Sequence, residues 1–241
     1  MCGRYVLIEG RKVLATFPML QQVTVKPGAW DLLPQYNAAP MQQMPVVAIR
    51  GGNRSVDLMQ WWLVPHWAKQ PKTEFSTFNA KAETLAQSRL FAGYFKGSRC
   101  LVPADAFYEW KKVTLEKGVG QPKGPGTEKQ PMCIRMKDEK PFMMAGLFSV
   151  WKSEDGAREL ATFTIITTQA NELLEPIHHR MPVILEEEDH ERWIDREYHD
   201  LENLNALLKP YPADRMFAYR VSRLINSSRN NREECLLPST S

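Results

Sequence analysis

The sequence predicts a single α+β domain in which strands are more numerous than helices. Its 241 residues, 43% of them hydrophobic, are enough to bury one full core. Short runs rich in β-branched, aromatic and methionine residues are typical of strands, and only a few segments have helical character. We find no internal repeat, and we therefore expect one domain over residues 1–241.

The expected strands share a high content of β-branched, aromatic or methionine residues. They are Arg4–Ile8, Met44–Ile49, Val56–Trp61, Met132–Met136, Pro141–Val150 and Ala161–Thr167. Between Val113 and Pro131 the composition changes to glycine, proline, lysine and glutamate. This change predicts a long solvated hairpin tip that joins two strands of one sheet.

The expected helices are Arg11–Gln21, the segment around Thr84–Ser88, Asn171–Leu174 and Glu186–Leu208. The last is the clearest, because apolar residues recur at helical spacing, acidic residues occupy the first turn and Pro210 follows the end. We expect it to be a scaffold helix. Residues 227–241 are expected to form a C-terminal tail whose last residues, Pro238–Ser241, are a loose end.

Composition excludes several classes of protein. No apolar run has the length of a membrane span, and the first twenty residues lack the features of a signal peptide. The four cysteines are far apart and include no C-x-x-C pair, which argues against a zinc finger and a disulfide framework. We expect a cytoplasmic monomer with no membrane partner, no metal and no cofactor.

The formal net charge of +3 is too small to indicate a nucleic-acid-binding protein by itself. Acidic residues are concentrated between Glu186 and Glu202, which leaves the rest of the chain more basic than the total suggests. A positively charged face elsewhere is therefore compatible with the composition.

Cys2 gives the sequence its most informative chemical feature. If Met1 is removed, as initiator methionines usually are before a small residue, Cys2 has a free α-amine beside its own thiol. This 1,2-aminothiol condenses with an aldehyde to a stable thiazolidine ring, and at pH 7 roughly a tenth of such an amine is neutral. The alternative is a disordered terminus without a role. The β-rich run Tyr5–Ile8 follows at once, however, and can hold the terminus in place.

Two polar clusters lie inside apolar neighbourhoods. In the first, Asn79, Lys81 and Glu83 alternate with small residues, and extended spacing places all three on one face. The alternative is a helix N-cap with a salt bridge. In the second, Glu109 lies between Tyr108 and Trp110, where desolvation raises the pKa of a carboxyl toward values useful for proton transfer. The alternative is an outward Glu109 that pairs with a neighbouring lysine.

Two more clusters have both a functional and a structural interpretation. His178, His179 and Arg180 have no nearby third ligand for a metal, so a proton-transfer histidine beside an anion-binding arginine is the better functional interpretation. The competing one is a polar surface turn. The aromatic run Trp61–Trp67 is either a corner of the core or a base-stacking platform.

Seven sequence blocks occur in the order found in the SOS-response-associated peptidase family, which the chain resembles from Cys2 to about Asn226. They are Met1–Tyr5, Tyr36–Pro40, Trp62–Trp67, Asn79–Thr84, Arg99–Lys111, Ile177–Pro182 and Val221–Arg223. The resemblance implies one α+β domain with an antiparallel, barrel-like β core flanked by helices. It also implies binding of abasic sites in single-stranded DNA along a basic groove.

The resemblance further implies that Cys2 crosslinks to the C1′ aldehyde of the opened sugar as a thiazolidine, which shields the lesion. Weak lyase activity, crosslink reversal and self-removal of Met1 belong to the same expectation. Asn79 would orient the opened sugar or the cysteine amine, and Glu109 would transfer protons during Schiff-base formation. His178, rather than His179, would protonate the sugar oxygen.

DNA contacts are expected from residues that the resemblance or their charge and aromatic character single out. They are Arg4, Asn37, Trp62, Trp67, Lys81, Arg180 and Arg223. Lys81 and Ile225 depart from the arginine and glycine common in the family, which affects phosphate affinity and loop geometry, respectively. Two other functions remain open: an N-terminal-cysteine amidohydrolase acting on a small amide, and a non-covalent single-stranded DNA-binding protein.

Overall fold

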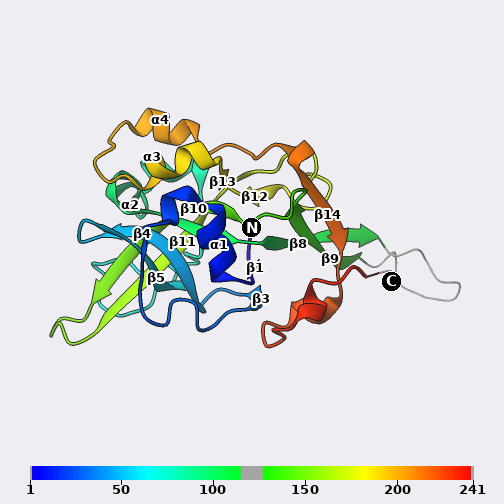
Figure 1. Cartoon of the computed structure of the whole chain (residues 1–241), viewed down its shortest axis with the longest axis horizontal. Helices are drawn as coiled ribbons and strands as arrows, with labels where there is room; N and C mark the ends of the chain where they lie inside the picture. The colour runs from blue at the N-terminus through cyan, green and yellow to red at the C-terminus, as the bar shows by residue number, and fades with distance from the viewer. Residues whose placement is uncertain (1, 115–126, 240–241) are drawn as a thin grey trace, which may run out of the picture.

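Five strands close into a barrel. In neighbour order they are β5 (Asn53–Trp61), β4 (Gln43–Arg50), β7 (Arg99–Ala104), β10 (Phe142–Lys152) and β11 (Glu159–Gln169). Four of them, β4, β5, β10 and β11, are labelled on the left in Figure 1. Each contact in this order is antiparallel, and a parallel pairing of β11 with β5 closes the ring. The structure is a computed structural model, and it describes residues 2–114 and 127–239.

Gly146 lets three barrel strands approach one another closely. A Cβ atom at this position of β10 would lie 2.9 Å from Cys100 Sγ on β7 and 2.9 Å from the carbonyl oxygen of Thr164 on β11. Real Cβ atoms do not approach other atoms so closely, so a side chain here would push the strands apart. The barrel core therefore depends on glycine at this point.

A second, antiparallel sheet lies beside the barrel. Its neighbour order is β14 (Met216–Arg220), β9 (Thr127–Met136), β8 (Ala106–Thr114), β1 (Tyr5–Leu7) and β3 (Gln35–Ala38). One face packs against the main core, and the other covers a smaller apolar cluster that includes Val6, Tyr108 and Cys235. Alternate residues of β8 therefore face the two cores.

The chain passes from the barrel to the second sheet at Asp105, between β7 and β8. The Asp105 N–H donates to the Val6 carbonyl oxygen at 2.8 Å, and the Ile8 N–H donates to Asp105 Oδ2 at 2.7 Å. These two bonds fix β1 at the junction of the sheets. The strand that follows Cys2 is thus attached to the centre of the molecule.

Short strands and helices complete the fold among the described residues. The strands are β2 (Thr24–Val25), β6 (Asn79–Lys81), β12 (Arg180–Pro182) and β13 (Ile184–Leu185). The helices are α1 (Gly10–Thr16), α2 (Ala92–Gly97), α3 (His190–Ile194) and α4 (Leu201–Ala206). The 3₁₀ turns are η1 (Pro18–Leu20), η2 (Ala82–Gln87), η3 (Glu187–Asp189), η4 (Ala213–Arg215), η5 (Arg223–Asn226) and η6 (Glu233–Cys235). The predicted α+β fold with a barrel-like core and flanking helices is confirmed.

The prediction of one long helix over Glu186–Leu208 is wrong. The segment consists of η3, α3 and α4, and α3 ends at Ile194. The buried guanidinium of Arg99 accounts for the break, because it donates to the carbonyl oxygens of Trp193, Asp195 and Tyr198. These carbonyls bond to a distant side chain instead of continuing a helical ladder.

The other predicted helices are shorter than expected or absent. Pro18 separates α1 from η1 within Arg11–Gln21, and the segment around Thr84–Ser88 is a 3₁₀ turn. The helix predicted at Asn171–Leu174 is wrong, because this segment is a turn. The Asn171 side chain accepts the Leu174 N–H at 3.0 Å, so the side chain competes with helical backbone bonding.

The hairpin of β8 and β9 continues to the pair Thr114–Thr127, so the predicted tip over Val113–Pro131 is too long at both ends. Residues 115–126 of this prediction lie outside the described residues. The expected loose end is wrong for Pro238 and Ser239, because Pro238 bridges Val221 and the Ser239 N–H donates to the Arg220 carbonyl oxygen at 2.9 Å. No helix among the described residues is long and apolar enough to cross a membrane.

Candidate active site

Strands β1 and β8 bring Cys2 close to Glu109. Tyr5 pairs with Phe107, and the Tyr108 N–H donates to the Arg4 carbonyl oxygen at 3.0 Å, so the same antiparallel register places Gly3 beside Glu109. Cys2 is fully buried in the main core. Burial, with a further contribution from the charge of Glu109, raises the pKa of the Cys2 thiol well above its ordinary value. The thiol is therefore protonated at neutral pH until a base removes its proton.

Glu109 lies on the face of β8 that is shared with Phe107 and directed toward the main core. The residue is only 2% exposed, and burial raises the pKa of its carboxyl to about 7. The alternative of an outward Glu109 is therefore wrong. A carboxyl with this pKa exchanges its proton readily at physiological pH, which suits general acid–base catalysis.

His178 lies at the end of the turn between β11 and β12. Its Nδ1 atom is 3.9 Å from Glu109 Oε1 and accepts the Arg180 backbone N–H at 3.1 Å. Burial lowers the pKa of His178 below its ordinary value, so the ring is neutral at physiological pH. A neutral ring that accepts at Nδ1 has its proton on Nε2. His179 stacks on it, with ring centroids 4.4 Å apart.

Asn79 begins β6, which pairs in parallel with β11. Its Nδ2 donates to the Phe78 carbonyl oxygen at 3.0 Å, while its buried Oδ1 has no hydrogen-bond partner among the described residues. An amide oxygen left unpaired inside a protein is costly unless a further group donates to it. Asn79 therefore has an acceptor available beside the site.

Both interpretations of the Asn79 cluster hold in part. Asn79 and Lys81 flank the buried Ala80 on a strand, as extended spacing predicts. Glu83 forms a salt bridge with Arg180 at 2.6 Å and lies in the first turn of η2, which follows the strand. The Arg180 guanidinium lowers the pKa of Glu83, chiefly through its hydrogen bonds.

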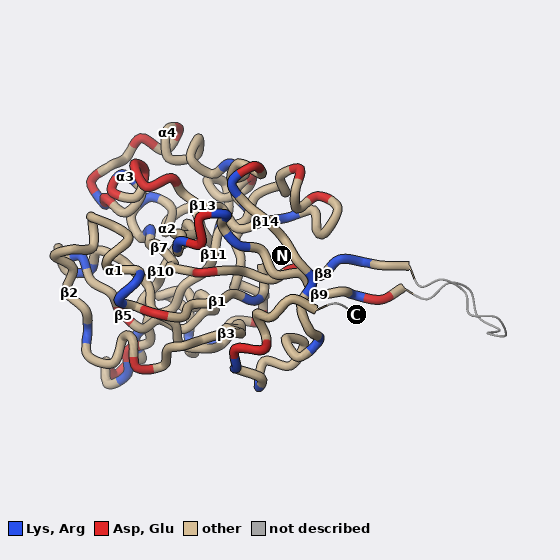
Figure 2. The backbone as a smooth tube through the Cα atoms, turned by 45° about the vertical axis from the view of Figure 1, so that its right-hand side comes forward, with Lys and Arg blue, Asp and Glu red and all other residues tan. Residues whose placement is uncertain are grey.

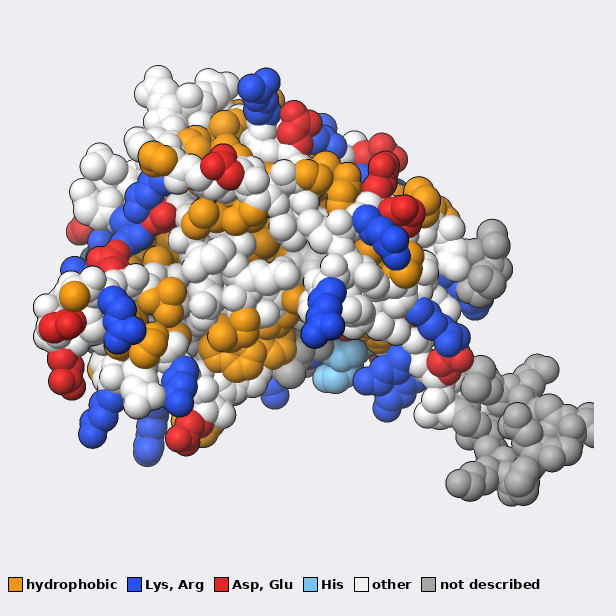
Figure 3. All heavy atoms as spheres, turned by 90° about the horizontal axis from the view of Figure 1, so that it is seen from below, with side chains coloured by type: hydrophobic (Ala, Val, Ile, Leu, Met, Phe, Trp, Pro, Cys, Tyr) orange, Lys and Arg blue, Asp and Glu red, His pale blue; other side chains and the backbone are white. Residues whose placement is uncertain are grey.

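A groove of about 840 Å³ opens beside Glu109 and His178. Its lining combines aromatic, basic and imidazole side chains from β8, β9 and the turn before β12. The lining residues are Phe78, Glu109, Trp110, Lys112, Lys129, Glu175, Pro176, Ile177, His178, His179 and Asn226. Figure 3 shows exposed histidine atoms between basic side chains and next to a hydrophobic patch. Glu109 and His178 therefore both lie at the surface of one groove.

Four of the residues predicted to contact DNA are exposed or half-buried. Trp67 is 66% exposed, and Lys81 is exposed on β6. Trp62 is half-buried, and its Nε1 donates to Thr73 Oγ1 at 2.9 Å. Arg223 is exposed and forms an ion pair with Glu128. DNA contacts by these residues stay predictions.

Arg4 and Arg180 have internal partners. Arg4 Nη1 donates to Asn37 Oδ1 at 2.8 Å and to the Ile225 carbonyl oxygen at 2.5 Å. The Arg180 side chain is 9% exposed and is paired with Glu83. These bonds hold both guanidinium groups in place, and phosphate contacts by them stay predictions.

The prediction that Asn37 contacts DNA requires a correction. Asn37 is 1% exposed, and its Nδ2 donates to the carbonyl oxygens of Ser227 at 3.0 Å and Asn230 at 2.9 Å. Together with Arg4 it attaches the C-terminal segment to β3. Ile225, where the family commonly has glycine, is buried in the smaller apolar cluster of that segment.

The groove residues that sequence reasoning missed include Trp110, Lys112, Lys129 and Asn226. Trp110 and Lys112 alternate on one strand, which places them on the same face. Lys129 joins them only through the register of β8 and β9, and Asn226 through its bond from Trp110 Nε1 at 2.8 Å. The alternation of Trp110 and Lys112 could have been found, whereas the two long-range contacts required the structure.

Comparisons with known proteins give a consistent result. The profile of the SOS response associated peptidase (SRAP) family matches residues 1–228. Abasic site processing protein YoqW of Bacillus subtilis is 40% identical over 237 residues, which cover 98% of this chain and 99% of that protein. Abasic site processing protein HMCES of Gallus gallus is 34% identical over 228 residues, covering 85% of this chain and 66% of that protein. The crystal structure of a Bacteroides thetaiotaomicron protein superposes with a TM-score of 0.78 at 28% identity, covering 97% of this chain and 98% of that one.

Proposed function

Because the chain belongs to the SOS response associated peptidase family, we propose that it binds abasic sites in single-stranded DNA and crosslinks to them through Cys2. The abasic-site processing proteins that it resembles support the substrate. The observation that supports the chemistry best is the meeting of Glu109 and His178, 3.9 Å apart, beside the strand that follows Cys2. An aminothiol and a proton-transfer pair are what thiazolidine formation requires.

Removal of Met1 gives Cys2 the α-amine that starts the reaction. The neutral amine attacks the C1′ aldehyde of the opened sugar and forms a carbinolamine. Protonated Glu109 then gives its proton to the carbinolamine hydroxyl, which leaves as water, and an iminium ion remains. A carboxyl with a pKa of about 7 is half protonated at neutral pH and can take this role.

Ring closure returns the proton to Glu109. The carboxylate takes the proton of the Cys2 thiol, and the thiolate sulfur bonds to the iminium carbon to close the thiazolidine. Amine, thiol and aldehyde have then lost one water in total, and Glu109 is restored to its protonated form. The raised pKa of the thiol means that deprotonation by Glu109 and attack on the iminium carbon occur together.

His178 and Asn79 assist at the sugar. The neutral His178 can donate a hydrogen bond from its Nε2–H to the ring oxygen as the sugar opens. The unpaired Asn79 Oδ1 can accept a hydrogen bond from the Cys2 amine or a sugar hydroxyl. The same proton-transfer groups support reversal of the crosslink and weak β-elimination at the lesion, and we include both activities in the proposal.

We also propose that the protein removes its own Met1 and acts as a monomer in the cytoplasm. Incubation of purified Met1-containing protein would show a mass loss of one methionine without added peptidase. A protein that keeps Met1 under these conditions would require a separate aminopeptidase. Light scattering would give the mass of one chain across a range of concentrations.

The crosslink is tested with single-stranded DNA that contains one abasic site. Protein with confirmed loss of Met1 should give an adduct that survives a denaturing gel without borohydride. Its mass should equal protein plus DNA minus one water, because the thiazolidine forms with loss of a single water. Two controls should give no adduct: Cys2→Ala, which lacks the thiol, and protein that retains Met1, which lacks the free amine.

The absence of an adduct from processed protein would contradict the proposal. Binding of intact and abasic strands with equal affinity would then favour a non-covalent DNA-binding protein. Hydrolysis of a small amide that depends on Cys2 would favour the amidohydrolase alternative.

A further inference from the structure

We propose that Lys112 and Lys129 together bind one backbone phosphate of the DNA next to the abasic nucleotide. The proposal rests on the proposed function and adds a positioning pair to it. Neither residue is singled out by the sequence blocks that indicate the family. The pair is defined by the register of the β8–β9 hairpin.

The two lysines face each other across the hairpin. Lys112 on β8 is the register partner of Lys129 on β9, and both line the groove. Directly opposite residues of an antiparallel pair have Cβ atoms about 4.5–5.5 Å apart, so both ammonium groups can reach one anion. Figure 2 shows basic positions on β8 and on β9 next to the undescribed segment.

This arrangement is unfavourable without an anion. Like charges directly opposite each other destabilise a sheet. Neither lysine has an ion-pair partner among the described residues, whereas Glu128, next to Lys129 on β9, is paired with Arg223. A bound phosphate would relieve the repulsion by placing negative charge between the ammonium groups.

The neighbouring side chains indicate a nucleotide rather than a small anion. Trp110 lies two residues before Lys112, on the same face of β8, and its half-buried ring lines the groove. A tryptophan ring beside a phosphate-binding pair allows a base and its phosphate to be held together. Glu175 lines the groove from the turn before β12, so its charge disfavours phosphates there and favours them at the hairpin.

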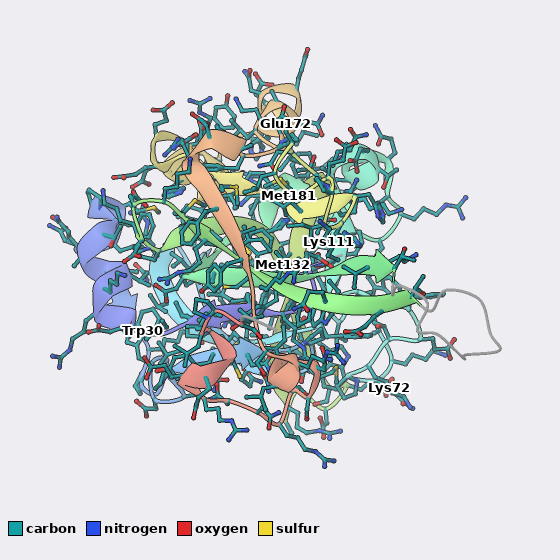
Figure 4. All side chains as sticks on the ribbon, turned by 90° about the vertical axis from the view of Figure 1, so that its right-hand side faces the viewer. Trp30, Lys72, Lys111, Met132, Glu172 and Met181 are labelled. Carbon is teal, nitrogen blue, oxygen red and sulfur yellow. The ribbon has the colours of Figure 1, made fainter. Side chains whose placement is uncertain are left out.

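Lys111 provides a matched control. It has the same charge on the same strand, lies opposite Gln130 and does not line the groove. Its position on the second sheet is labelled in Figure 4. A change of Lys111 therefore reports the effect of losing one positive charge on β8 outside the groove.

The test measures equilibrium binding in a Cys2→Ala background, so that crosslinking does not contribute. The probe is a single-stranded oligonucleotide with one abasic site. Lys112→Gln/Lys129→Gln should raise Kd about tenfold, and the slope of log K against log salt should fall by roughly 0.7 for the lost phosphate contact. Lys111→Gln should bind within about twofold of the background protein. Lys112→Arg/Lys129→Arg should bind the oligonucleotide with the Kd of the background protein, because arginine also binds phosphate.

A neutral backbone locates the phosphate. Methylphosphonate linkages placed one at a time around the abasic site should weaken binding to the background protein at one position. The same substitution should have no further effect on Lys112→Gln/Lys129→Gln. Equal Kd values for Lys111→Gln and Lys112→Gln/Lys129→Gln would overturn the proposal. A methylphosphonate effect that persists in Lys112→Gln/Lys129→Gln would also overturn it.

The reaction with 2-deoxyribose separates this proposal from the crosslinking chemistry. The free sugar has the aldehyde and no phosphate, so the glutamine variants with Cys2 intact should form the thiazolidine at the rate of the unaltered protein. If the unaltered protein does not react with 2-deoxyribose, the proposed crosslinking chemistry is contradicted and the proposed phosphate contact is not. A slower sugar reaction in the double glutamine variant would show that the lysines act on the chemistry, and it would overturn the assignment to phosphate.

Discussion

Burial shifts the pKa values of the two groups proposed to transfer protons, Glu109 and His178, in opposite directions. It raises the pKa of Glu109 to about 7 and lowers that of His178, so both side chains have a substantial uncharged population at physiological pH. Glu109 then has a proton to give, and His178 has an Nε2–H with which to donate a hydrogen bond to the sugar. Such a pair can move protons without placing a permanent charge in the core.

The pH dependence of crosslinking should report Glu109. The rate should rise with pH as the Cys2 amine loses its proton, at about 7.7–8.0 for an ordinary α-amine, and should fall above about pH 7 as Glu109 loses its own. The two trends give a maximum near neutrality. In Glu109→Gln the rate should be about a hundredfold lower, and the decline on the alkaline side should disappear. Single-turnover rates between pH 5.5 and 9 measure both effects.

Glu175→Gln is the control for this experiment, because it removes an exposed carboxyl from the same groove. It should keep the maximum at the same pH. An alkaline decline that persists in Glu109→Gln would assign the titration to another group.

At the scale of elements, part of the set of strands could be predicted, whereas β7 and β14 were not predicted and the predicted long helix is wrong. Each predicted strand overlaps an observed one, because β-branched and aromatic residues favour the extended backbone locally. The end of α3 depends on Arg99, which lies about a hundred positions away in the chain. The periodic leucines of the segment Glu186–Leu208 correctly predict a helix where α4 lies. They contain no information about the distant guanidinium of Arg99.

The candidate site shows the same division. Cys2 and Glu109 were identified from their chemistry and neighbours, whereas their roles with Asn79 and His178 came from the family resemblance. No spacing predicts the 3.9 Å approach of Glu109 to His178, because β8 and the turn before β12 meet only in the folded chain. The burial of Asn37 likewise depends on the C-terminal segment that covers it.

Arg99 should be essential for the order of α3 and the segment after it. Its guanidinium also donates to the carbonyl oxygens of Phe95 and Lys96 at 2.7 Å, so Arg99→Met would leave several buried acceptors unpaired. We expect a loss of about 3–5 kcal/mol in the free energy of unfolding, measured with urea. Arg196→Met, which removes one bond from an exposed side chain, should cost less than about 1 kcal/mol. Equal losses in the two variants would contradict this role.

At the scale of the whole molecule, the site lies where the barrel and the second sheet join. Asp105 fixes β1 at that junction, β8 supplies Glu109, and the turn between β11 and β12 supplies His178. The hairpin of β8 and β9 extends away from the barrel in Figure 1 and forms one wall of the groove. The barrel is therefore a rigid support, and the two sheets position the reactive groups together.

The stability of the whole fold should depend on pH through His190. This buried histidine connects α3 to β13, which pairs with β10 of the barrel, through its Nε2 atom, 3.3 Å from the Leu185 carbonyl oxygen. It also packs edge-on against Phe17. Burial lowers its pKa from 6.5 to about 4. The unfolded chain therefore binds a proton at this residue between about pH 6.5 and pH 4, and the folded protein does not. The contribution of His190 to stability is complete above pH 6.5 and falls by about 3 kcal/mol on acidification to pH 4.

The measurement is the difference in free energy of unfolding between the unaltered protein and His190→Leu, obtained by urea titration from pH 7.5 to pH 4. Taking the difference removes the opposite contributions of Glu109 and Asp105, whose raised pKa values favour the folded state in acid. The variant should gain relative stability as the pH falls, because leucine has no proton to bind in the unfolded chain. His199→Leu, which changes an exposed histidine before α4, should follow the unaltered protein across the range. If the difference in free energy of unfolding between the unaltered protein and His190→Leu stays constant with pH, His190 is protonated within the folded core as readily as in the unfolded chain. The imidazole would then need an anionic partner, which its packing against Phe17 does not supply.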